Sequence, residues 1–255
     1  MEASTTVEKA VDVLFHLHVT PRPVGVTDLG RALGLPKSSA HRLLAALAKR
    51  GLVDRDDRGR YRPGIALLAL GLGVLDSEPI VAAARQVLEA GARDLGETHF
   101  LVGARGGRLL VLDKAEGSGF LRASPQVGSS VPVHATAVGK LQLAFAPEDL
   151  EPFDREAFTG QTLVDPLDLE REVERTRVTG VAANRGEWIP GLSVVAAPVF
   201  HAGVLAGCVA IAASSPRLDA LDAELGPNGV VDRMRAAAEA VAARLGGLGL
   251  AGDSS

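Results

Sequence analysis

The fold of the N-terminal part of this chain is decided by one stretch, LPKSSAHRLLAALAKRGLV, at residues 35–53. At about 100° per residue in a helix, its apolar residues share one face. They are Ala40, Leu43, Leu44 and Leu47. Its polar and basic residues gather in the first two turns or on the other face: Lys37, Ser38, Ser39, His41, Arg42 and Lys49. Pro36 suits the start of such a helix, and Gly51 suits its end.

Two shorter helical patterns precede this stretch, and a hairpin pattern follows it. The segments VEKAVDVLFHLHV and VTDLGRALGL have apolar residues at helical spacing, and Thr27 is the expected N-cap of the second helix. The segment LVDRDDRGRYRPG alternates around the turn DDRG. The order helix, helix, tight turn, helix, hairpin predicts a winged helix-turn-helix.

A small, polar and basic helix face can lie close to a hydrogen-bonding, anionic surface, and the DNA major groove accepts a helix of that width. Arginines at 55, 58, 60 and 62 would meet phosphates from the hairpin. The candidate contacts to double-stranded operator DNA are Thr27, Lys37, Ser38, Ser39, His41, Arg42, Lys49, Arg58 and Arg60. The alternative is a small helical domain whose polar face is simply solvated.

The charge of the chain is unevenly distributed. A net charge of −4 argues by itself against a nucleic-acid-binding protein. Residues 1–63, however, hold 11 Lys and Arg and 7 Asp and Glu, a local charge of +4, which leaves −8 for the remainder. This asymmetry indicates a basic module joined to an acidic one, and 255 residues suffice for two domains.

Several classes of protein are disfavoured. The single cysteine, Cys208, lies in an apolar run and is expected to be a buried thiol, so neither an internal disulfide nor a cysteine-rich zinc site is expected. The sequence contains no Walker loop, HExxH motif or Ser-His-Asp spacing, and neither enzymatic activity nor a cofactor is expected. Without a signal peptide or an apolar run of membrane-spanning length, a cytoplasmic protein with no membrane partner is expected.

The remaining elements predict an α+β domain with antiparallel strands and segregated helices. The helix at 65–78 is apolar nearly all round, so a second subunit or the next domain should cover it. Thr136 is the expected cap of a helix over 136–146. The other expected helices are 79–97, 165–180 and about 222–245, with a disordered tail after them. The expected strands are 99–105, 108–116, the start of 120–135 (entering a loop), 192–200 and 205–214.

Four segments together resemble the IclR family of bacterial transcription regulators, and the resemblance covers almost the whole chain. They are VEKAVDVL, TDLGRALGLPKSSAHRLLAALAKRGLVDRDDRGRYRPG, VPVHATAVGK and IPGLSVVAAPV. The resemblance implies a winged helix-turn-helix domain at 1–63, a linker helix at 64–78 and a GAF-like effector-binding domain at 79–246, followed by the tail 247–255. It further implies a ligand-responsive regulator, expected to be a repressor, that binds operators as a homodimer or homotetramer.

The resemblance also implies a small-molecule effector site. It comprises Ala123, Ser130, Val131, His134, Ala137, Val138, Asn184, Val194, Ala210 and Ala212. The N–H groups at the start of the helix at Ala137 favour an anion, and Gly139 allows close approach. Acid-sensing relatives carry an acid, a cysteine and two hydroxyls where this chain has Asn184, valine and two alanines. An acid with an apolar body, or a neutral ligand, is therefore expected rather than a small polar keto acid.

Three residues keep alternative interpretations. His134 is either a ligand contact or a loop histidine whose ring bonds to backbone. Trp188 either lines the mouth of the pocket or packs in the core, and the core is favoured. Lys140, read as a catalytic amine, has no partners for chemistry, so it is expected to reach solvent or to pair with an acid. For the whole chain, the alternatives are a constitutive regulator without effector and an enzyme with an accessory helical domain.

Overall fold

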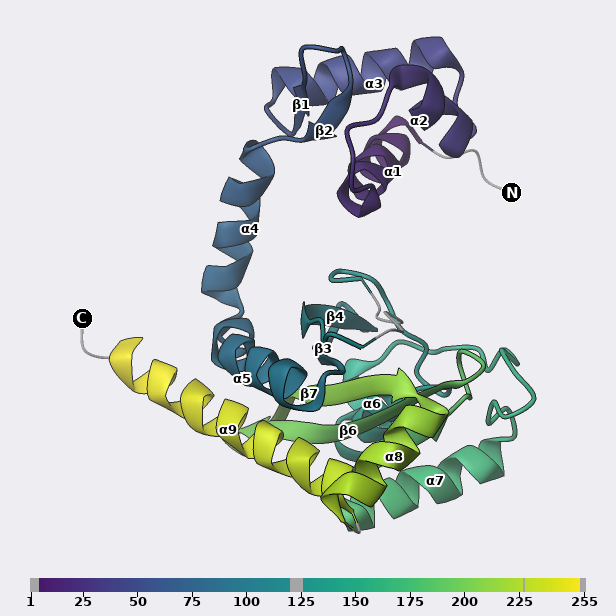
Figure 1. Ribbon diagram of the computed structural model, residues 1–255, viewed down its shortest axis with the longest axis vertical. Coiled ribbons are helices and arrows are strands. Elements are labelled where there is room, and N and C mark those ends of the chain that lie inside the picture. The colour runs from purple at the N-terminus through teal and green to yellow at the C-terminus, as the bar shows by residue number, and fades with distance from the viewer. Residues whose placement is uncertain (1–4, 120–125, 227, 253–255) are drawn as a thin grey trace. The chain divides into compact units, whose positions relative to one another are not determined.

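The computed structural model describes residues 5–119, 126–226 and 228–252. The chain divides between Ser77 and Glu78 into two compact units (Figure 1). Among the described residues, no single helix is long and apolar enough to cross a membrane; only Ala66–Val74 and Pro79–Leu95 taken together, across a break, meet that criterion of length and composition. Among the same residues, no group of three or more His, Cys, Asp or Glu side chains is placed to hold a metal ion.

The N-terminal unit begins with three helices. They are α1 (Thr6–Val19), α2 (Val26–Ala32) and α3 (Lys37–Lys49). The side chain of Thr5 caps α1 by accepting the N–H of Glu8 at 3.2 Å. The expectation that Thr27 caps α2 is wrong. The cap is Gly25, whose carbonyl accepts the N–H of Leu29 at 3.0 Å, so Thr27 already lies inside the helix and is exposed.

The hairpin consists of β1 (Val53–Arg55) and β2 (Tyr61–Pro63), paired in antiparallel register. Tyr61 also exchanges two backbone hydrogen bonds of 2.8 Å with Val24, which ties the hairpin to the segment before α2. The core of the unit joins all these elements through Val13, Leu17, Leu29, Ala40, Leu44, Leu47, Val53 and Tyr61. The predicted winged helix-turn-helix is confirmed.

The helix α4 (Ala66–Ser77) follows the hairpin and has an apolar surface. Four of its large side chains are more than half exposed in this chain: Leu68, Leu70, Leu72 and Val74. The composition of α4 predicts that its apolar surface is buried, but the described residues of the chain itself do not bury it.

In the C-terminal unit, the described strands form one antiparallel sheet in the order β4-β3-β7-β6-β5. Their bounds are β3 (Thr98–Arg105), β4 (Arg108–Ala115), β5 (Ala182–Arg185), β6 (Leu192–His201) and β7 (Val204–Ser214). The expected α+β class with an antiparallel sheet is confirmed. The edge strand β5 was not expected, because a four-residue strand is too short for its alternation to show.

Helices cover both faces of this sheet (Figure 1). One face packs against α5 (Pro79–Leu95), α8 (Ser215–Leu225) and α9 (Gly229–Gly252). The other face packs against α6 (Ala137–Phe145), and α7 (Pro166–Thr179) packs against α6 in turn. Alternate residues of the strands thus serve two separate cores.

The expected final helix at about 222–245 is wrong in its extent. A helix begins at Ser215, where Pro216 occupies its first turn, and the chain breaks near Gly226 and Asn228, which both have positive φ. The helix α9 then continues through Gly246 and Gly247 to Gly252, so the disordered tail expected from residue 247 is wrong as far as residue 252. Of the strand expected at the start of 120–135, residues 120–125 lie outside the described residues.

Candidate functional site

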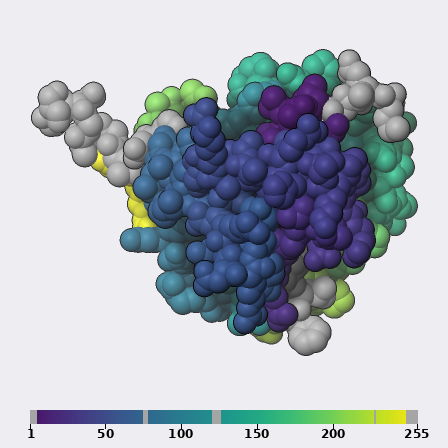
Figure 2. Space-filling model, turned by 90° about the horizontal axis from the view of Figure 1, so that it is seen from above, coloured from purple at the N-terminus to yellow at the C-terminus, as the bar shows by residue number. Residues whose placement is uncertain are grey.

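The first candidate surface is the outer face of α3. Lys37, Ser38, His41, Arg42 and Lys49 are exposed, and Ser39 is partly buried. Their partners on the inner face, Ala40, Leu44 and Leu47, are buried in the core, and Leu43 is partly buried, as the spacing predicts. Figure 2 shows the outer face of this unit, where α3 and the β1–β2 hairpin form one continuous surface.

The arginines of the hairpin are not equivalent. Arg60 bonds to the Asp56 carboxylate at 3.1 Å, and Arg62 lies 4.0 Å from Asp54. Backbone and side-chain hydrogen bonds from Arg60 lower the pKa of Asp56, which therefore stays ionised at the turn. The guanidinium of Arg55 lies 5.7 Å from the ring centre of Tyr61. Arg55 and Arg58 form no ion pair among the described residues, and of these two Arg58 lies at the exposed tip of the hairpin.

A groove of about 380 Å³ lies between α1 and α3, beside the candidate DNA-contacting face. Thr6 and Lys9 of α1 line it together with Ser39 and Arg42 of α3. The sequence reasoning did not select Thr6 and Lys9, because their pattern marks α1 only as an amphipathic helix. Their nearness to Arg42 depends on the packing of α1 against α3, which no local pattern reveals.

The second candidate site lies on the α6 face of the sheet. Asn184 pairs with Val194, and Val194 pairs with Ala212, so these residues form one row across three strands. Ala210 belongs to the same buried cluster, two residues before Ala212 on β7. All four are at least nine-tenths buried, and the Oδ1 atom of Asn184 has no hydrogen-bond partner among the described residues. A buried amide oxygen without a partner can accept a hydrogen bond from a donor group of a ligand.

The start of α6 faces the same cluster, and Val131, Ala137 and Val138 are buried in it. Thr136 caps the helix as predicted, by accepting the N–H of Gly139 at 3.1 Å. Among the described residues, none accepts a hydrogen bond from the N–H groups of Ala137 and Val138. Those two groups remain available for an anionic or carbonyl oxygen.

Two of the expected contacts are not placed with this cluster. Ser130 is exposed and forms a bridge to Leu110 of β4. Ala123 lies outside the described residues. The loop before α6 is nevertheless fixed to β4, because Val131 donates to Leu109 and Val111 donates to Ser129, both at 3.0 Å.

His134 has contacts that the sequence could not indicate. Its Nε2 atom bonds to the carbonyl of Glu156 at 2.8 Å, and its ring stacks between Phe153 and Phe158 at 6.2 and 5.6 Å. For the Nε2 atom, the interpretation of His134 as a loop histidine whose ring bonds to backbone is therefore confirmed. Its Nδ1 atom is buried and has no hydrogen-bond partner in the described part of the chain, so a role in ligand contact stays a prediction.

Lys140 is 1% exposed, so the alternative in which it reaches solvent is wrong. Its ammonium donates to Glu187 at 2.7 Å and to the carbonyl of Ala183 at 3.0 Å, and Glu172 lies 3.9 Å away. The expected pairing with an acid is confirmed. This pair joins α6 to the segment after β5.

Trp188 and Cys208 pack against or within the same cluster. Trp188 is partly buried there, which fits the core interpretation without excluding the mouth of a pocket. Burial raises the pKa of the Cys208 thiol to about 12, so the thiol stays protonated at neutral pH. The expectation of a buried thiol is confirmed.

Residues 72–243 match the family model described as the C-terminal domain of the bacterial transcriptional regulator IclR, and residues 6–57 match the IclR helix-turn-helix domain. The chain belongs to the IclR family. The resemblance of the four quoted segments to this family is thereby confirmed, and so is a helix-turn-helix transcription regulator as the class of protein.

Relatives extend over nearly the full chain. The glycerol operon regulatory protein of Streptomyces coelicolor is 34% identical over 247 residues, which cover 94% of this chain and 96% of that protein. The HTH-type transcriptional regulator XynR of Escherichia coli K12 is 31% identical, covering 86% of this chain and 89% of that protein. The crystal structure of Thermotoga maritima IclR matches with a TM-score of 0.74 at 27% identity, covering 94% of this chain and 98% of that one.

Proposed function

We propose that this IclR-family chain is an operator-binding repressor whose affinity for DNA responds to a small effector bound in the C-terminal unit. The observation that carries the proposal is the exposed polar face of α3 in a winged helix-turn-helix. A recognition helix in the major groove, with the hairpin tip at Arg58 near phosphates, occupies DNA that other proteins would otherwise contact. We propose repression for that reason. An operator–reporter assay in which deletion of the gene lowers transcription would contradict it.

Arg42 is the side chain of α3 from which we expect the largest effect on operator affinity. A bidentate contact with a base is worth about 1–3 kcal/mol, so Arg42→Ala should weaken operator binding by that amount. Scrambled DNA should be much less affected at the same salt concentration. Gel shifts on both DNAs measure the difference, and Arg31→Ala, which removes an exposed charge of α2, serves as the control. An equal loss on both DNAs would reassign Arg42 to phosphate.

We propose that two copies of the chain cover the apolar surface of α4, giving a homodimer or a tetramer built from dimers. The support is the exposure of Leu68, Leu70, Leu72 and Val74 on a helix without a polar face. A dimer also places two recognition helices on successive half-sites, about one helical turn of DNA apart. The proposed domain limits are those given above, with 64–78 as the linker.

Charging the surface of α4 should dissociate the oligomer. Leu68→Glu buries a carboxylate in the proposed interface, so light scattering should show a shift toward the mass of one chain. Val178→Glu makes the same change at a position of α7 that is 79% exposed, and it should leave the mass unaltered. A folded Leu68→Glu protein of unchanged mass would show that α4 is not the interface.

We propose that the effector binds between the start of α6 and the row formed by Asn184, Val194 and Ala212. A carbonyl or carboxylate oxygen would meet the free N–H groups of Ala137 and Val138. The body of the ligand would lie over valine and alanine side chains, which favours apolar over hydrophilic acids. Binding alters operator affinity only if the two conformations of the chain differ in affinity for the ligand.

Ligand binding at this site should raise the melting temperature, since a ligand that binds only the native state stabilises it. Acids with an apolar body should do so, and glyoxylate should not. Val194→Asp should abolish the effect by burying an unpaired charge, and Asn184→Leu should weaken it while sparing the fold, because it removes an oxygen that has no partner. Thermal melts of the full chain against a metabolite panel test this, with operator affinity in the absence of ligand as the control. Stabilisation by glyoxylate alone would contradict the apolar site.

A second candidate is a constitutive regulator without effector. The observation that favours it is the buried, apolar character of Val194, Ala210 and Ala212. The same thermal panel separates the two candidates, because a constitutive regulator would be stabilised by none of the compounds.

A further inference from the structure

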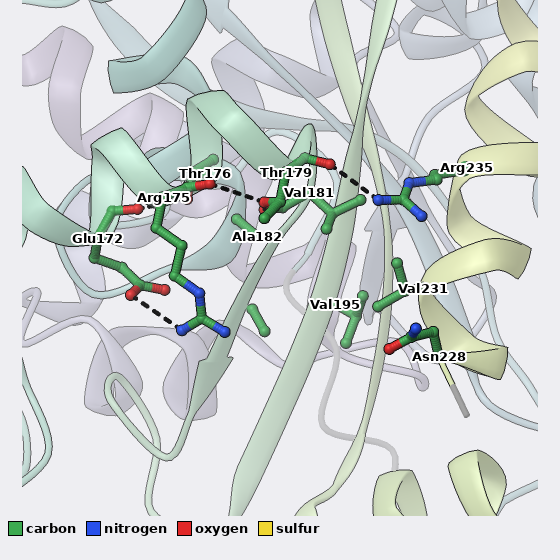
Figure 3. A pocket seen from close by; sticks show the side chains of 11 residues that line it. Glu172, Arg175, Thr176, Thr179, Val181, Ala182, Val195, Asn228, Val231 and Arg235 are labelled. Atoms are coloured by element: carbon green, nitrogen blue, oxygen red, sulfur yellow. Dashed lines mark hydrogen bonds and ion pairs between the residues drawn. The ribbon is translucent and has the colours of Figure 1, made fainter. Parts of the chain in front are cut away.

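A cavity of about 330 Å³ lies at the β5 edge of the sheet, between α7 and the first turns of α9 (Figure 3). It lies at the edge of the sheet, where Val195 of the α9-side core and Ala182 of the α6-side cluster both line it. None of the candidate effector residues lines it. Its volume lies at the lower end of the range of ligand sites.

Two guanidinium groups approach this cavity from opposite sides, Arg175 from α7 and Arg235 from α9 (Figure 3). Arg175 is three-quarters exposed and lies 3.6 Å from Glu172. Arg235 donates to the carbonyl of Thr179 at 2.9 Å and to Asp232 at 3.1 Å. A guanidinium has five N–H donors in a planar fork, so both arginines retain donors beyond these contacts.

The edge of β5 adds a further donor. Gly186 donates to Leu192 of β6, so by alternation the odd-numbered residues of the strand face outward. The outward carbonyls already have donors, Lys140 on Ala183 at 3.0 Å and Thr179 Oγ1 on the carbonyl of Val181 at 3.1 Å. The outward N–H of Ala183 meets no acceptor among the described residues. The edge therefore offers a donor and no free acceptor at this point.

The carboxylate of Glu172, which lines the cavity, does not give the cavity a net negative charge. Glu172 is shared between Arg175 in front, at 3.6 Å, and the buried ammonium of Lys140 behind, at 3.9 Å. Lys140 is itself paired with Glu187 at 2.7 Å, so these two carboxylates and two cations together carry no net charge. The exposed guanidinium of Arg175 can nevertheless donate to an incoming anion, because its contact with Glu172 does not use all of its N–H donors.

The remaining lining is aliphatic: Val181, Ala182, Val195 and Val231. We propose that this cavity is a second ligand site, for a small organic carboxylate with a short branched aliphatic body. The carboxylate lies between Arg175 and Arg235, within reach of the N–H of Ala183, and the aliphatic body packs on the valines. The inference does not depend on the proposed effector site or on operator binding.

Calorimetric titration of the full-length protein with isovalerate tests the proposal. We expect one site per chain that depends on Arg175, in addition to any binding at the α6-side site. Isovaleramide, which lacks the charge, and inorganic phosphate, which lacks the aliphatic body, should show no comparable Arg175-dependent binding. Arg175→Met should weaken binding about tenfold or more, as for the loss of a charge-assisted hydrogen bond. Arg171→Met is the matched control. Arg171 is equally exposed, one turn earlier on α7, and it has the same i,i+3 pairing with an acid.

Two further variants locate the site. Val231→Phe should remove the Arg175-dependent binding by filling the cavity, whereas Asn184→Leu, in the candidate effector site, should leave that binding unchanged. Three results would overturn the proposal: no binding of isovalerate at millimolar concentration, equal affinity in the protein and its Arg175→Met variant, or loss of binding in Asn184→Leu. The last would place the probe in the α6-side site. Gel shifts with operator DNA report on the proposed function separately.

Discussion

Replacing Gly139 with alanine is expected to destabilise the C-terminal unit by about 3 kcal/mol or more, at the upper end for overpacking. A Cβ atom at this position would lie 1.8 Å from the carbonyl oxygen of Val133 and 2.5 Å from its carbonyl carbon. Both are backbone atoms, so no change of side-chain rotamer relieves the clash. Either the loop before α6 or the helix itself must move, and both are packed against the sheet.

Chemical denaturation of the full-length protein measures this effect, with the transition of the C-terminal unit followed by the fluorescence of Trp188. Gly246→Ala is the control, because Gly246 lies in α9 with no atom within 4 Å of its missing Cβ. That change should be neutral or should add up to about 1 kcal/mol from helix propensity. A Gly139→Ala protein as stable as the parent would mean that the close packing of α6 on Val133 is wrong. Any loss of effector binding in this variant would follow from the displaced loop.

The winged helix-turn-helix could be predicted because its signals are local. The apolar spacing of Ala40, Leu43, Leu44 and Leu47 fixes which side of α3 enters the core, and the exposed side follows from it. The hairpin likewise follows from alternation around one turn. The N-cap of α2 was predicted wrongly because the local signals of the sequence do not identify it uniquely. Gly25 and Thr27 both suit a helix start, and only the bond from Leu29 to the carbonyl of Gly25 decides between them.

The candidate effector site was only partly accessible to sequence reasoning. The resemblance to the IclR family supplied both Val194, Ala210 and Ala212 and their place opposite α6, and these three residues lie in one buried cluster with the start of α6. The surroundings of His134 had no such signal, since Phe153 and Phe158 lie 19 and 24 residues further along the chain in an irregular segment. Contacts of that kind are set by tertiary packing alone.

Lys140 shows the same limit most clearly. Its position in α6 gives no hint of burial, because a lysine in a helix is ordinarily solvated. Its partner Glu187 is 47 residues away, and both side chains are nearly inaccessible to solvent. The ammonium of Lys140 is held by Glu187, by Glu172 and by the carbonyl of Ala183. Lys140 thereby links α6, α7 and β5, although a lysine at this position of a helix is expected at the surface.

Removing this cation is expected to be as severe as any single change in the chain. Lys140→Met keeps the length of the side chain but leaves Glu187 buried without its counter-ion, which typically costs about 3–5 kcal/mol of unfolding free energy. Lys49→Met, at an exposed position of α3, should change stability by no more than about 0.5 kcal/mol. Thermal or denaturant unfolding of both proteins gives the comparison.

The double variant Lys140→Met, Glu187→Gln separates the loss of the ion pair from the loss of packing. If the uncompensated carboxylate causes the damage, neutralising Glu187 in the Lys140→Met background should restore a large part of the stability, although Glu187→Gln alone destabilises the parent. Additive effects of the two changes would instead mean that Lys140 acts mainly through its bond to the carbonyl of Ala183 and its aliphatic stem. Glu172 remains paired with Arg175 in every variant, so the comparison isolates the pair between Lys140 and Glu187.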